Sequence, residues 1–183
     1  MLGDLRDDAD TSVGIPYLID FASRERELPL TLETLRALGR TRDPRALAFL
    51  LERVATAVPL VSVAAVEALS GSDESQCRAA LTAALSNPEP EVIKAALQWF
   101  SSARSIPEPE VVACLHHPVW DVRRLAADVL GSQATETARH ALSEHLSVES
   151  ESIVREAVIR SLGRHGPTGS LRSILPPAER ESE

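Results

Sequence analysis

The amino-acid sequence predicts an all-α protein, a right-handed α-solenoid of about five stacked helix pairs. Two observations predict this class: a block of ten residues recurs along the chain, and each block places apolar residues at helical spacing. A third observation is that aromatic residues make up only 3% of the 183 residues. Because strands favour aromatic and β-branched residues, this composition disfavours a β-sandwich or barrel and suits closely packed helices. With 44% hydrophobic residues, the chain can bury a core without disulfides or metals.

The recurring block begins about every 31 residues, a period typical of repeat architectures. Its first and ninth residues are large and apolar, and its fifth is small or β-branched, so these three positions share one face of a helix. We expect this face to form the core, with the small central residue allowing a close helix neighbour. The five blocks begin at Leu30, Val61, Val92, Val122 and Val154, and their fifth residues are Thr34, Ala65, Ala96, Ala126 and Val158.

A turn and a second helix are predicted after each block. The tenth residue is Gly or Ser, and Gly favours the left-handed conformation that ends helices, so we expect the helices to stop at Gly39, Ser70, Ser101, Gly131 and Gly163. Asp43 before Pro44 and Thr135 before Glu136 are typical N-caps, and Asp73 with Gln76 resembles a capping box. The next helices are expected over residues 44–54, 74–85, 107–117 and 135–146. A helix over residues 16–26 would open the first pair.

Both ends of the sequence are acidic and polar. Residues 1–12 and 177–183 are therefore expected to be disordered, which leaves one repeat domain over residues 13–176. Terminal repeats lack a neighbour on one side, and we expect the short segment 170–175 to cover the last apolar face.

The net charge of −8 is concentrated at these ends, since residues 31–175 have 17 acids and 15 bases. A nearly neutral body does not suit nucleic acid, whose binding depends on neutralised phosphates. No signal peptide and no apolar run of about 18 residues is recognisable, so we expect a cytoplasmic protein with no membrane contact. Cys77 and Cys114 lie in apolar helical stretches and are expected to be buried thiols. We also expect a monomer and no cofactor.

The sequence resembles a known repeat family at two places. Residues Asp121, Val122, Arg123, Ala126 and Leu130-Gly131, together with D-P-R-A-L at residues 43–47, are similar to the HEAT-like, armadillo-like helical repeats of bacterial α-solenoids. The resemblance covers about 150 residues. It implies a polar ladder between repeats, formed by an Arg after the first Val of the block. Only Arg123 and Arg155 match, so the ladder would exist at one end alone.

Catalytic and metal sites are not predicted. His140 and His145 are five residues apart on a helix and point in different directions, and Cys114, His116 and His117 have no second ligand cluster. HEAT-like hydroxylases use His-Glu dipeptides, which this sequence lacks. We therefore expect a protein that is not an enzyme; the alternative is a HEAT-like lyase or chromophore-handling protein.

The resemblance implies that the second helices line a concave face that binds a protein partner. The exposed candidates on these helices are Lys94, Gln98, Trp120, Arg123, Arg124, Arg155, Arg160 and Arg164. Arg can hold partner carboxylates in bidentate hydrogen bonds, which favours an acidic segment. Equally, Arg123 and Arg155 could pair with Asp121, Asp128, Glu151 and Glu156 and only fix the stacking. Trp99 is expected in the core, and Trp120 either packs against the preceding helix or is exposed as a binding hot spot. The predicted function is a scaffold or adaptor.

Overall fold

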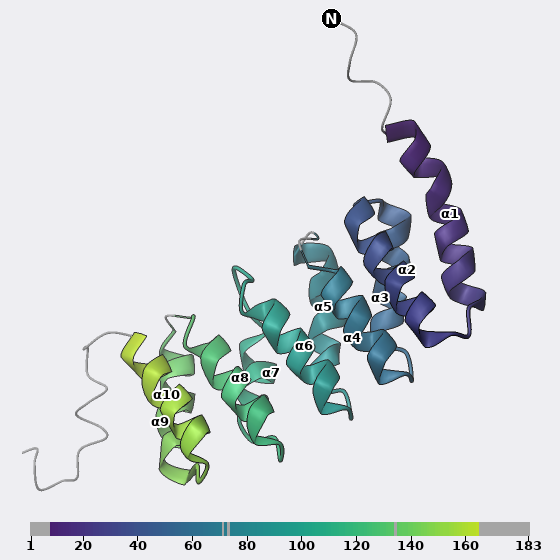
Figure 1. The fold of residues 1–183 in the computed structure, drawn as a ribbon. Helices are drawn as coiled ribbons and strands as arrows, with labels where there is room; N and C mark the ends of the chain where they lie inside the picture. Colours follow the sequence, from purple (N-terminus) through teal and green to yellow (C-terminus); the bar gives the residue numbers. More distant parts are fainter. Residues whose placement is uncertain (1–7, 71, 73, 134, 165–183) are drawn as a thin grey trace, which may run out of the picture. The chain divides into compact units, whose positions relative to one another are not determined.

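The computed structural model describes residues 8–70, 72, 74–133 and 135–164, and all their regular secondary structure is helical (Figure 1). The all-α prediction is confirmed. None of the described helices is long and apolar enough to cross a membrane. The ten described helices are α1 (Asp8–Arg24), α2 (Leu28–Thr41), α3 (Pro44–Val54), α4 (Pro59–Ala68), α5 (Glu74–Ala84), α6 (Pro90–Phe100), α7 (Glu108–Cys114), α8 (Trp120–Leu130), α9 (Glu136–Val148) and α10 (Ser152–Arg164).

Contacts group the chain into two compact units, Met1–Trp99 and Phe100–Glu183, where the sequence predicts one repeat domain over residues 13–176. In the first unit, α2 packs against α1, α3 and α4, and α3 also contacts α5. In the second unit, α8 packs against α10, while α7 and α9 pack behind them (Figure 1). Each unit therefore contains two layers of helices, and successive repeats add one helix to each layer.

Helix starts follow the capping residues in the sequence. The Asp43 side chain accepts a hydrogen bond from the Arg45 backbone N–H at 2.8 Å, and Pro44 occupies the first turn of α3. The Thr135 hydroxyl accepts one from the Ala138 N–H at 3.1 Å and begins α9. Both predicted N-caps are confirmed. The predicted cap at Asp73 lies outside the described residues.

The recurring block forms the core. Its first, fifth and ninth residues are buried in every repeat with one exception, Leu30, which is 45% exposed. Leu30 lies in α2, and among the described helices no repeat precedes this one to cover the position. The other block residues give the cores of the two units, including Leu38, Ala65 and Leu69 in the first and Val122, Ala126, Leu130 and Val158 in the second.

Glycine at the tenth block position has a different role from the one predicted. Gly39 and Gly163 lie inside α2 and α10, and Gly131 at the end of α8 has a right-handed φ of −65°. The left-handed residue is instead Arg42, with a φ of 54° at the C-cap of α2. A Cβ on Gly131 would lie 2.4 Å from the Ser161 Oγ, so this glycine permits close approach of α8 and α10 rather than a turn.

The first helix is longer than the predicted range of residues 16–26. It begins at Asp8, within the stretch of residues 1–12 that we expected to be disordered, and Pro16 lies inside it. Adding residues to an existing helix is inexpensive compared with nucleating a new one, which favours this extension over a separate start at Pro16. Residues 1–7, the segment 170–175 and the tail 177–183 lie outside the described residues.

Both cysteines are buried free thiols, as the sequence predicts. Burial raises the pKa of the Cys114 thiol to about 11, so it stays protonated at neutral pH. These residues contribute to packing.

Candidate functional site

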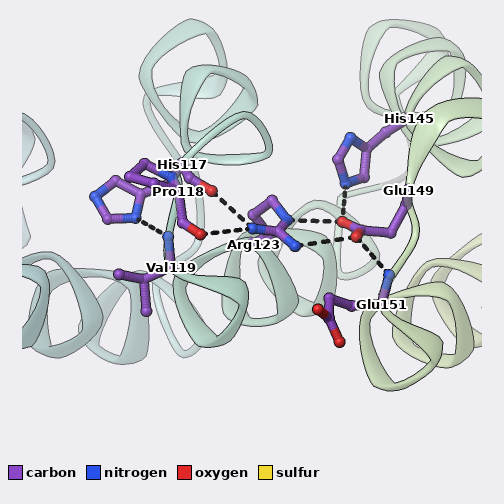
Figure 2. Close-up of polar contacts among 7 residues, drawn as sticks. All are labelled: His117, Pro118, Val119, Arg123, His145, Glu149 and Glu151. Carbon is purple, nitrogen blue, oxygen red and sulfur yellow. Dashed lines mark hydrogen bonds and ion pairs between the residues drawn. The ribbon is translucent and has the colours of Figure 1, made fainter.

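A buried ion pair connects α8 to the turn between α9 and α10 (Figure 2). The Arg123 guanidinium donates to both carboxylate oxygens of Glu149, from Nε at 2.7 Å and from Nη2 at 3.0 Å. Its Nη1 donates to the backbone carbonyls of His117 and Pro118 at 2.9 and 3.0 Å. Four of the five guanidinium N–H groups are thus used, and the residue joins three segments of the second unit.

Glu149 is held from three directions. Besides Arg123, its Oε2 lies 2.9 Å from His145 Nε2, and its Oε1 accepts from the Glu151 backbone N–H at 2.9 Å. Since a carboxylate only accepts, His145 must donate from Nε2. The Glu149 side chain is 2% exposed, yet each oxygen has two donors. Its acceptor sites are filled, which is what a buried charge requires.

The pKa values follow from these contacts. The Arg123 hydrogen bonds lower the pKa of Glu149 from 4.5 to about 2, against the opposing effect of burial. The same pair raises the pKa of Arg123. For His145, burial lowers the pKa and outweighs the opposing effect of Glu149. At neutral pH the network therefore holds one positive charge, one negative charge and a neutral imidazole, and its members are fixed.

A row of partly exposed side chains follows the outer surface of α8 and α10, and we name it the α8–α10 strip. Arg124 pairs with Asp121 at 2.8 Å and with Asp128 at 3.3 Å, within α8. Arg160 on α10 lies 3.5 Å from Asp128 and 3.0 Å from Glu156, so Asp128 connects the two helices. The strip consists of Trp120, Asp121, Arg124, Asp128, Ile153, Glu156 and Arg160.

Two large apolar side chains belong to this strip. Trp120 is 42% exposed in the first turn of α8, and Ile153 is 52% exposed in the first turn of α10. Each lies at the start of a helix whose later turns contain the ion pairs. The strip thus combines an apolar end with alternating charges, a composition typical of protein interfaces.

Comparison with known proteins supports the resemblance. Residues 108–176 match the family of HEAT repeats. The chain is a HEAT-like repeat protein. Two crystal structures of engineered proteins share its fold, with TM-scores of 0.58 and 0.56 at 19% and 20% identity, over 86% of this chain and 85% and 83% of theirs. A designed armadillo repeat protein in complex with the peptide (KR)4 gives 0.58 at 15% identity, over 85% of both chains. No curated protein sequence matches. The helix pairs of the HEAT-like repeats form an α-solenoid.

The HEAT-like repeats place the predicted binding residues in three environments. Trp120, Arg124 and Arg160 lie in the α8–α10 strip, and Arg123 lies in the buried network instead. Arg155 and Arg164 are exposed on α10. Lys94, paired with Glu91 at 2.7 Å, and Gln98 lie on α6, which belongs to the first unit except for its last residue.

The repeats also place the aromatic and histidine candidates. Trp99 is half-buried, and its indole N–H donates to the Leu69 carbonyl at 3.3 Å. His140 is exposed and lies 3.3 Å from Glu144. His116 and His145 rings meet edge to face, with centroids 5.7 Å apart. Within the part of the chain that the structure describes, no three of these or other ligating residues form a group that could hold a metal.

Sequence reasoning missed Glu149. The four acids considered as partners of Arg123 are in or beside helices α8 and α10, whereas Glu149 is the C-cap of α9, 26 residues from Arg123. One signal could have indicated it: a carboxylate in a polar turn, four residues after His145 on the same helix. Ile153 was missed as well, because an apolar residue next to a block resembles a core position.

Proposed function

We propose that this HEAT-like protein is a non-catalytic scaffold that binds a segment of a protein partner along the α8–α10 strip. One observation above all supports the proposal: two adjacent helices present a row of partly exposed apolar and charged side chains on a base locked by the Arg123–Glu149 pair. Residues already fixed before binding lose little entropy in a complex. The designed armadillo repeat neighbour, solved with a peptide, supports the same use of this fold.

The charges of the strip define the partner's chemistry. Its three carboxylates, Asp121, Asp128 and Glu156, outnumber Arg124 and Arg160, and each Arg already has carboxylate neighbours. An acidic segment would have to displace them. We therefore propose a partner segment that bears both signs of charge, which exchanges ion pairs with the strip, and an apolar side chain that contacts Trp120 and Ile153.

A peptide-display selection against the immobilised full chain tests this function. We expect enriched peptides with an apolar or aromatic residue flanked by charges of both signs. Trp120→Ala should weaken the best peptide about 5- to 30-fold, the range expected for a hot-spot residue.

Val148→Ala is the matched control, because Val148 is 72% exposed on α9 and lies outside the strip. It should leave affinity unchanged. A selection that yields no enriched motif, or equal affinities for the parent and Trp120→Ala proteins, would rule the proposal out.

A further inference from the structure

The last described helix exposes a face that the other repeats bury. At the sixth position of the block, Leu35, Val66, Leu97 and Ala127 are at most 1% exposed, whereas Ile159 on α10 is 56% exposed. Arg155, one turn earlier on the same side of the helix, is exposed too. We name Arg155 and Ile159 the end face. In a stacked array such a face is where the next repeat packs.

Arg155 occupies the position that Arg123 occupies one repeat earlier, 32 residues before it. Arg123 is 14% exposed and bonded to Glu149, 26 residues further along the chain. No residue in the described ranges forms an ion pair or side-chain hydrogen bond with Arg155. The end face therefore lacks both an apolar cover and a carboxylate.

The sequence beyond α10 contains both, in the same register. Glu149-Ser150-Glu151 recurs as Glu181-Ser182-Glu183, 32 residues later, so Glu181 follows Arg155 by the same 26 residues. Leu142, fully buried in α9, corresponds to Ile174. The match to HEAT repeats also continues past α10 to residue 176.

We propose that residues 170–181 dock on the end face as a partial repeat, with Ile174 in the place of Leu142 and Glu181 paired to Arg155 as Glu149 is to Arg123. Pro176 and Pro177 stop a helix where α9 continues. The chain can still reach, because six extended residues span up to about 20 Å and six helical ones about 9 Å. The array would thus be capped by its own chain.

A charge-reversal cycle on the full chain tests the pairing, with amide hydrogen exchange of α10 as the readout. Arg155→Glu and Glu181→Arg should each speed exchange of the amides between Ala157 and Leu162, by about three- to ten-fold. The double variant should restore the parent rate. Ile174→Asp should speed exchange of the same amides.

Glu179→Arg is the matched control, because it changes charge two residues away from the proposed register. Combined with Arg155→Glu, it should give no recovery. Equal recovery with Glu179→Arg, or none with Glu181→Arg, would overturn the proposal. Protection of α10 that increases with protein concentration would also overturn it, since a second copy would then cover the end face.

Discussion

At the scale of single residues, Arg123 and Arg155 show how one repeat position can have two roles. They follow the first Val of successive blocks, yet Arg123 is buried in an ion pair and Arg155 is exposed on α10. Arg123→Met should lower the free energy of unfolding by about 3 kcal/mol, because it leaves Glu149 buried with half of its donors. Arg155→Met should cost less than about 1 kcal/mol. Urea denaturation measures both, and similar losses would contradict the assigned role of Arg123.

His145 and Glu149 make stability depend on pH. Both have a pKa below its unfolded value, so the folded state binds fewer protons than the unfolded state, and stability is lost as pH falls. The His145 contribution is complete above pH 6.5 and decreases below it. That of Glu149 is lost between pH 4.5 and about 2.

We therefore expect the free energy of unfolding to fall from pH 7.5 to pH 5.5, by less than about 1.4 kcal/mol per pH unit for the single proton. His145→Gln should flatten this part of the profile. His140→Gln, at an exposed histidine, should leave it unchanged. A slope that survives His145→Gln would assign the pH dependence to another group.

At the scale of helices, the glycines report how closely the repeats pack. Gly131→Ala should destabilise the protein by about 1–3 kcal/mol, because the new methyl group would overlap Ser161 across the α8–α10 contact. Gly163→Ala meets nothing within 4 Å and should stabilise α10 by roughly 0.5 kcal/mol through helix propensity. Thermal unfolding of the two variants measures the contrast. Opposite signs would show that Gly131 acts through turn conformation, as the sequence alone suggests.

Helix positions were predictable because their causes are local. Asp43 with Pro44 and the Thr135 cap mark helix starts in the sequence, and the i, i+4, i+8 spacing marks the core face. The role of Gly131 was not predictable, since it depends on Ser161, 30 residues away. Glu149 was missed for the same reason: its partner Arg123 is distant in sequence and becomes its neighbour only after the repeats stack.

At the scale of the whole molecule, the repeats explain both the fold and the proposed surface. Each repeat adds one helix to each layer of its unit, so exposed positions recur in rows, and the α8–α10 strip is one such row. The candidate residues could be predicted as a set, because they share a helix face. Their division into buried network, strip and end face could not, because ion pairing between neighbouring repeats decides it.

Hydroxyl-radical footprinting with and without a selected peptide tests the central claim, that the strip binds a protein segment. Trp120 and Ile153 are exposed and reactive in the free protein, and we expect saturating peptide to lower their oxidation several-fold. Tyr17 and Phe21 on α1, which are 77% and 43% exposed, should be oxidised equally in both samples. Protection of Tyr17 and Phe21 with unchanged oxidation of Trp120 would contradict the account.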